Sequence, residues 1–312
     1  MDETRQYERW REILERIEQV NDPGTQAYFK QALPCFYKTY PIEPMHDESP
    51  PGISHIGGHP DLPAGTPWPV DDEGRPLPFL AQVNLSELEP GFAPYVPPKG
   101  WLYFFAVFPD RWGDIPHRVI YFDGSEEELR RAESPSQYYK PHGLRFETGF
   151  TLYGDMLEKV FDDHPDLSLT SREAGLLFDH FQGERTRLGG HPMSFQPLSE
   201  QHAYLKLSGF DDLYRYGTSM YSLESFIRRE QLDAADPDLA AHLRTEVRRQ
   251  IEEYRRDFAV HKQCMQSIRP IFVLGSEDDM QWGDLGFLQF FMHEDDLAKR
   301  DFSHTYCEVI TT

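Results

Sequence analysis

Apolar residues along the chain form short strand-like runs that occur twice in the same order. The first set comprises residues 79–83, 100–105 and 118–122, and the second comprises residues 271–274, 286–292 and 306–310. Runs of this length that are rich in aromatic and β-branched residues predict β-strands. Each set follows the same tetrapeptide, Gly57-Gly58-His59-Pro60 in the first case and Gly189-Gly190-His191-Pro192 in the second. The recurrence predicts duplication of one structural unit.

Helical spacing of apolar residues appears at the N-terminus and in an insertion within the second set. Residues 3–20 predict a helix with one apolar face, and residues 25–33 predict a shorter helix. In the insertion, Asp236 as N-cap and Pro237 at the first helical position open a basic amphipathic helix that continues through Phe258. Its arginine-rich face is a solvated surface stabilised by ion pairs or, alternatively, a membrane or partner element.

Capping boxes predict two further short helices. Ser125–Glu128 opens a helix that ends at Ala132, and Thr170–Glu173 opens a second one. Residues 156–161 have helical spacing as well. Residues 138–153 predict irregular or extended chain with one strand that ends at Leu152.

These elements predict an α+β fold in one compact body. Residues 1–52 form an N-terminal helical segment and loop, residues 53–182 form a first, mainly antiparallel β unit, and residues 183–312 form a second, similar β unit. The second unit carries the helical insertion at residues 221–263.

Composition narrows the classes of function. The 312 residues include 53 Asp and Glu against 31 Lys and Arg, for a formal net charge of −22. This charge repels nucleic acid and anionic lipid and favours a basic protein partner, although solubility alone also explains it. Cys35, Cys264 and Cys307 are widely spaced, which indicates a reducing compartment. With a charged N-terminus and no long apolar run, we expect a soluble, cytoplasmic protein without a membrane span.

Three motifs resemble those of the YwqG-like family of uncharacterised bacterial proteins. They are Gly57-Gly58-x-Pro60 followed by Trp68-Pro69 and residues 76–88, then residues 188–196, and then residues 282–291. The resemblance extends from about residue 53 to the C-terminus and departs at Leu274, where the family pattern has a glutamine. It implies a fold rather than a reaction. Some YwqG-like proteins are encoded near secreted toxins, which implies an immunity-type role as one version of the function.

Motifs of common catalytic and nucleotide-binding sites are absent, including GxSxG, GxGxxG, GxxxxGK[ST] and HExxH. Cys35 lacks the local pattern of a nucleophile and is predicted to be a buried structural thiol. If the two units pack about a pseudo-twofold axis, His55, His59 and His191 could bind a metal together with Asp284. Hydrogen-bonded loop histidines and an Asx turn at Asp284 are the interpretations that we adopt, so no metal or cofactor is expected.

The predicted binding site is a groove at the junction of the two β units, flanked by Trp68 and Trp282. Its candidate residues are Gly57, Gly58, His59, Trp68, Gln82, Gly189, Gly190, His191, Gln196, Trp282 and Asp284. Gln82, inside a predicted buried strand, either bonds neighbouring backbone or faces a ligand. The main hypothesis is a non-catalytic protein that binds a basic protein partner, for example a toxin that it neutralises. The alternative is an enzyme, or a small-ligand or metal binder, that uses the groove. The sequence does not determine the oligomeric state.

Overall fold

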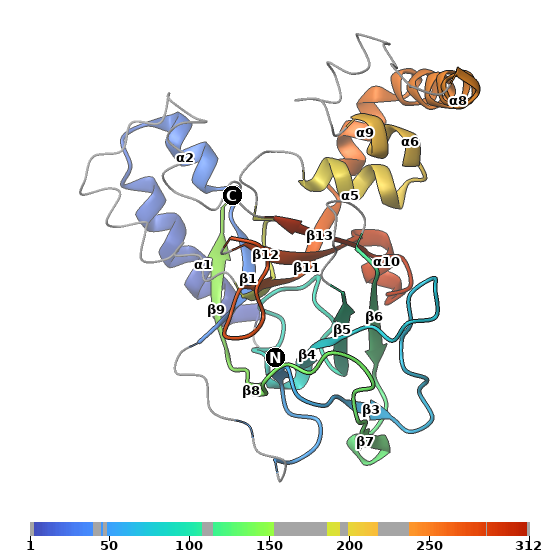
Figure 1. Ribbon diagram of the computed structural model, residues 1–312. Helices are drawn as coiled ribbons and strands as arrows, with labels where there is room; N and C mark the ends of the chain where they lie inside the picture. Colours follow the sequence, from blue (N-terminus) through green and yellow to red (C-terminus); the bar gives the residue numbers. More distant parts are fainter. Residues whose placement is uncertain are drawn as a thin grey trace. The chain divides into compact units, whose positions relative to one another are not determined.

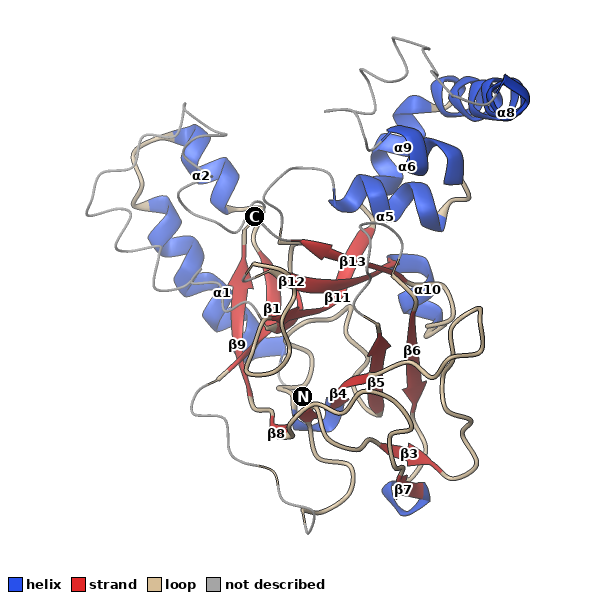
Figure 2. Ribbon diagram, viewed as in Figure 1, coloured by secondary structure: helices blue, strands red, loops and turns tan. Residues whose placement is uncertain are grey.

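The computed structural model describes most of the chain as two compact units. The described residues are 3–39, 45, 49–107, 115–152, 186–193, 199–217, 237–284 and 286–310. The larger unit comprises Met1–Pro197 and Arg269–Thr312, and the smaller comprises Leu198–Ile268. Helices and mainly antiparallel strands occur together, which confirms the predicted α+β class (Figure 2). The predicted unit boundaries at residues 52 and 182 stay predictions.

The larger unit contains two main β-sheets and a small ribbon (Figure 1). The six-stranded sheet has the order β13 (Tyr306–Ile310), β12 (Phe287–His293), β11 (Ile268–Gly275), β10 (Arg187–Gly189), β1 (Leu33–Lys38), β9 (Phe146–Thr151). The five-stranded sheet has the order β6 (His117–Phe122), β5 (Trp101–Ala106), β4 (Phe79–Asn84), β2 (His55–Ile56), β8 (His142–Gly143). Strands β3 (Asp61–Pro63) and β7 (Leu129–Arg131) form the ribbon.

Four strands of each main sheet follow the same spatial order. The order β6-β5-β4-β2 in one sheet corresponds to β13-β12-β11-β10 in the other. In both sheets, a short strand immediately precedes or enters the Gly-Gly-His-Pro segment, and the next three strands in the order are those predicted from the apolar runs. The shared order is what duplication of one unit would produce, and the duplication itself stays a prediction.

Aromatic residues hold the two main sheets together. Phe104 on β5 stacks on Phe272 of β11, with ring centroids 4.4 Å apart, and lies 5.1 Å from the ring of Phe290 on β12. Alternate residues of β5 point to the opposite face, where Trp101, Tyr103 and Phe105 form a second core with Leu62 and Leu129 of the ribbon. Strands β4 and β5 are therefore buried on both faces, which explains why they lack polar alternation.

Helices α1 (Glu3–Glu18) and α2 (Pro23–Phe29) precede the first strand. Ile13, Ile17 and Val20 join the core of the larger unit, as the predicted apolar face requires. Asp22 caps α2 by accepting a hydrogen bond from the Thr25 amide at 2.7 Å. Helix α10 (Glu294–Lys299) follows β12.

The described residues of the smaller unit are mainly helical. It contains α5 (Ser199–Leu207), α6 (Asp211–Gly217), α8 (Pro237–Arg256) and α9 (Phe258–Met265). Helices α5 and α6 were not predicted from the sequence. Among the described helices of the whole chain, none combines the length and the apolar character that a membrane span requires.

Two of the predicted helices differ from the structure, and two others cannot be compared with it. The capping box at Ser125 forms, but it supports a single 3₁₀ turn at Glu126–Glu128, because the following residues pair with β3 instead of continuing the helix. The insertion helix ends at Arg256 rather than continuing through Phe258, and α9 begins after Asp257. The predictions for residues 156–161 and 170–173 and for the cap Asp236 lie outside the described residues.

Both Gly-Gly pairs adopt backbone conformations that favour glycine. The φ angles are 61° and 73° at Gly57 and Gly58, and 73° and 84° at Gly189 and Gly190. The chain also approaches each pair closely: a Cβ on Gly57 would lie 2.2 Å from the carbonyl oxygen of Lys140. Glycine is required here by both torsion and space.

Gly57→Ala tests this requirement, with Gly65→Ala as the matched control. Gly65 also has a positive φ, 83°, but its Cβ would meet no atom within 4 Å. We expect the control to lower the free energy of unfolding by about 1 kcal/mol, the cost of the left-handed conformation alone. Gly57→Ala should cost at least about 2 kcal/mol more, since the backbone of residue 140 must also move. Equal urea-unfolding midpoints for the two variants would contradict the argument from close approach.

Candidate functional site

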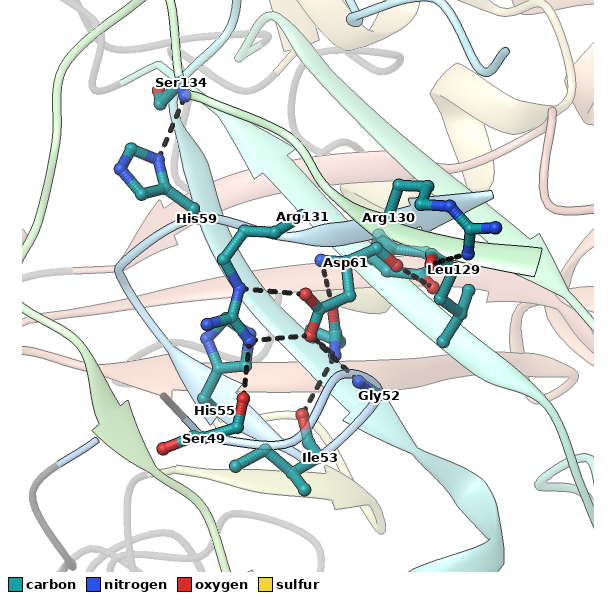
Figure 3. A network of polar contacts seen from close by, with 12 residues as sticks. Ser49, Gly52, Ile53, His55, His59, Asp61, Leu129, Arg130, Arg131 and Ser134 are labelled. Carbon is teal, nitrogen blue, oxygen red and sulfur yellow. Dashed lines mark hydrogen bonds and ion pairs between the residues drawn. The ribbon is translucent and has the colours of Figure 1, made fainter. Parts of the chain in front are cut away.

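The first Gly-Gly-His-Pro segment leads into a buried polar network centred on Asp61 (Figure 3). Asp61 begins strand β3 and is fully buried. Its carboxylate accepts hydrogen bonds from Nε of Arg131 at 3.0 Å and from the Gly52 amide at 2.9 Å. Arg131 lies opposite Asp61 in the ribbon and also donates to the Ser49 carbonyl at 3.3 Å. The network thus ties residues 49–52 to the ribbon.

The main-chain groups of Asp61 are also bonded. The amide of Asp61 donates to Oε1 of Gln82 at 2.7 Å, and its carbonyl accepts from the Tyr103 hydroxyl at 2.7 Å. Nε2 of Gln82 donates to the Ile53 carbonyl at 2.9 Å. The backbone-bonding interpretation of Gln82 is therefore confirmed. The carboxylate, the amide and the carbonyl of Asp61 are thus all hydrogen-bonded within the chain.

A second buried glutamine, which the sequence analysis did not single out, has the same role after the second Gly-Gly-His-Pro segment. Gln289 on β12 is fully buried, accepts from the Met193 amide at 2.8 Å and donates to the Met193 carbonyl at 2.7 Å. Met193 and Asp61 occupy the same position relative to their tetrapeptides. The family pattern has a glutamine at the position of Leu274 on β11, and the glutamine that bonds Met193 lies on the neighbouring strand β12. A polar residue within the apolar run at 286–292 was the signal that could have found it.

His55, two residues before the first Gly-Gly-His-Pro segment, and His59, within it, differ in environment. His55 is fully buried, and Nδ1 lies 2.8 Å from the Gly57 carbonyl, which can only accept, so Nδ1 carries the proton. Burial lowers the pKa of His55 to about 4, against an opposing contribution from Asp61. His59 is half-buried, accepts from the Ser134 amide at 3.0 Å and packs on the Tyr138 ring at 4.9 Å. Both are hydrogen-bonded loop or strand histidines.

The second Gly-Gly pair is held by a different set of side chains. The Gly190 amide donates to the Tyr95 hydroxyl at 2.6 Å, and the His191 amide donates to Oγ1 of Thr151 at 2.6 Å. Nε2 of His191 lies 2.8 Å from the Gln31 carbonyl, and burial lowers the pKa of His191 to about 4. Tyr95 lies between β4 and β5, so a connection in the five-stranded sheet supports a segment that enters the six-stranded one.

The connection between β11 and β12 in the six-stranded sheet in turn supports the first Gly-Gly pair. The Gly58 amide donates to the Tyr139 carbonyl at 2.8 Å, and the Tyr139 ring meets Trp282 edge-on at 6.5 Å. The carboxylate of Asp279 accepts from the Lys140 amide at 3.1 Å. Segment 139–140, which supports the first Gly-Gly pair, is thus held by the connection between β11 and β12.

The remaining candidate residues lie in different surroundings. Trp68 is half-buried, packs edge-on against Phe105 at 5.3 Å and donates to the Leu77 carbonyl at 2.9 Å. Trp282 is buried, and its indole donates to the Gly275 carbonyl at 3.1 Å. Asp284 is exposed. Gln196 lies outside the described residues. The groove predicted at the junction of the two β units, residues 53–182 and 183–312, stays a prediction.

The chemistry available in this network is anchoring. Within the described ranges, no group of three or more His, Cys, Asp and Glu side chains is arranged to hold a metal ion. Cys35 is buried, as predicted. Among the polar side chains named for a ligand site, Gln82 has both ends of its amide bonded to backbone, and His59 and His191 each have a ring nitrogen at hydrogen-bond distance from backbone.

Comparison with known protein families gives one match. A model of the family described as a domain of unknown function, DUF1963, matches residues 54–309. The matched range begins one residue before His55 and ends within β13, so it includes both Gly-Gly-His-Pro segments and both buried glutamines. No curated protein matches the chain.

Gln289→Leu tests the importance of the second glutamine. Removing the amide leaves the buried amide and carbonyl of Met193 without their partners, so we expect the free energy of unfolding to fall by about 2–4 kcal/mol. Gln82→Leu should have a similar effect. Gln137→Leu, at an exposed position, is the control and should stay within about 0.5 kcal/mol of wild type in urea unfolding. A cost below that of the control for Gln289→Leu would refute the anchoring role.

Because His55 is buried, we expect the folded protein to lose stability in mild acid. Because the folded-state pKa of His55 is about 4 and the unfolded value is about 6.5, the unfolded state takes up the proton first as pH falls. The contribution of neutral His55 to the free energy of unfolding is fully present above pH ~6.5. It is lost progressively as the pH falls from ~6.5 to ~4. Urea unfolding of His55→Gln should show a shallower dependence on pH in that window. The exposed control His304→Gln should keep the wild-type slope. An unchanged slope in His55→Gln would contradict the prediction.

Proposed function

Because this chain belongs to the DUF1963 family, whose function is unknown, we propose from its own features that it is a non-catalytic protein that binds a positively charged protein partner. The net charge of −22 is the observation that carries the proposal. A field of this sign attracts basic partners, orients them during encounter and discourages acidic ones.

Burial removes as many positive as negative residues from the surface of the described chain, so the excess of negative charge remains. The charged residues that are buried as whole residues in the described chain are Lys38, Asp61, Arg187 and Glu308. They are two basic and two acidic residues, so burial does not reduce the excess of negative charge. The other acidic residues whose burial is described are at least partly exposed as whole residues, and there they act on an approaching partner.

The narrower assignment is that the chain is a YwqG-like member of this family. Its support is the set of motifs around Gly57-Gly58, residues 188–196 and residues 282–291. On this basis the basic partner is a toxin that the protein neutralises by covering a positively charged surface. Electrostatic complementarity supports fast association in such a pair.

The test is capture followed by reconstitution. Tagged protein is incubated with lysate of the native host at low and at high salt, and retained proteins are identified by mass spectrometry. Each candidate is then purified and its Kd measured by calorimetry across salt concentrations. We expect a basic protein that binds directly with 1:1 or other fixed stoichiometry, and whose affinity falls about tenfold or more between low and high salt.

Two results would overturn the proposal. One is the absence of any basic protein that binds directly after purification. The other is a partner whose affinity does not change with salt, since binding would then depend on contacts other than charge. Wild-type protein unfolded by heat serves as the control for non-specific retention.

A further inference from the structure

We propose that a surface around Trp68 and Tyr138 is the docking site for a positively charged segment that carries apolar side chains, on the protein partner inferred above. We define the Trp68–Tyr138 surface as His59, Trp68, Val70, Ser136 and Tyr138. The proposal rests on the proposed function and adds the location and the chemistry of the contact.

Two segments far apart in sequence meet at this surface. The Leu77 carbonyl accepts a hydrogen bond from the Trp68 indole at 2.9 Å and another from the Ser136 hydroxyl at 3.1 Å. One oxygen atom therefore joins residues 68–70 to residues 136–138. His59 extends the surface, because it accepts from the Ser134 amide and packs on Tyr138.

Apolar side chains are exposed here. Val70 is 49% exposed and Tyr138 is 47% exposed, and these are the two exposed large hydrophobic residues in the described part of the larger unit. The exposed part of a tyrosine ring offers a contact for aliphatic groups and for the cations of Lys or Arg. Exposed aromatic residues beside a charged rim are typical of protein contact sites.

Hydrogen bonds and prolines within the chain constrain the backbone that carries this surface. Val70 pairs with Pro76 across a tight turn, in which Asp71 accepts from the amides of Glu73 and Arg75. Pro67 and Pro69 restrict the backbone on both sides of Trp68. Below the surface, the Asp61 network holds the chain that carries His59. Preorganisation of this kind lowers the entropic cost of binding.

The two chain segments that meet at this surface are acidic. Segments 64–76 and 123–138 contain eight acidic residues and three basic ones. The basic side chains are occupied within the chain: Arg75 pairs with Asp71 and Glu73, Arg131 pairs with Asp61, and Arg130 donates to main-chain carbonyls. The uncompensated charge is therefore negative, which selects a cationic segment as the occupant.

The experiment uses the full chain and three fluorescein-labelled synthetic peptides of equal length. One alternates Lys and Arg with Phe and Leu, one has Ser in place of Phe and Leu, and one has Glu in place of the basic residues. Fluorescence anisotropy measures binding at low salt. We expect the first peptide to bind at least about tenfold more tightly than the second, and the third not to bind.

Variants locate the contact. We expect Val70→Asp with Tyr138→Ala, and separately Asp72→Lys with Glu133→Lys, to weaken binding of the first peptide at least about tenfold. Matched controls place the same kinds of change on the smaller unit: Val260→Asp with Phe258→Ala, both exposed apolar residues, and Glu252→Lys with Asp257→Lys, both exposed acids. The controls should stay within about twofold of wild type, and circular dichroism confirms that each variant is folded.

The proposal is overturned if the Ser peptide binds as tightly as the apolar one, if no peptide binds measurably, or if control and surface variants weaken binding equally. The purified partner from the capture experiment separates this proposal from the proposed function. A basic partner that binds the Val70→Asp, Tyr138→Ala variant at wild-type strength shows that the function stands and the surface is wrong. Failure to find any basic partner removes the function itself.

Discussion

Main-chain amide and carbonyl groups that are buried away from water must find partners, and this requirement organises the chain after each Gly-Gly-His-Pro segment. Asp61 and Met193, the residues that follow the two segments, both donate their amides to a buried glutamine. Each glutamine presents an acceptor and a donor on one short side chain, which suits it to bond extended backbone. The glycines adopt the left-handed backbone conformation. The chain turns there, and the amides of Asp61 and Met193 then reach the two glutamines.

The two main sheets depend on each other because each supports the loop of the other. Tyr95, from the connection between β4 and β5, bonds the Gly190 amide, while Asp279 and Trp282, from the connection between β11 and β12, hold segment 139–140 against Gly57 and Gly58. Stacking of Phe104 on Phe272 fills the space between the sheets. The same anchoring holds His59 and the surface residues beside it, so the stability of the fold and the shape of the proposed docking site have one physical source.

Much of the fold followed from local pattern. The strands at residues 79–84, 101–106 and 306–310, the N-terminal helix and the burial of Cys35 and Gln82 were all predictable, because each depends on hydrophobic periodicity or on a polar residue inside an apolar run. Capping residues were less informative. Ser125 makes its capping box, yet the chain pairs with β3 after one turn, since strand pairing and burial of Leu129 outweigh the cap.

The sequence by itself determined the α+β class, the recurrence of the Gly-Gly-His-Pro segment, and the large negative charge, because these depend on composition and on neighbours along the chain. Tertiary structure decided what those residues contact. It paired Asp61 with Arg131, bonded the main chain of Met193 to Gln289, and joined Trp68 to Ser136 through one carbonyl. Each of these contacts links residues that are far apart in sequence, and their geometry is set by sheet register and burial, which no local pattern encodes.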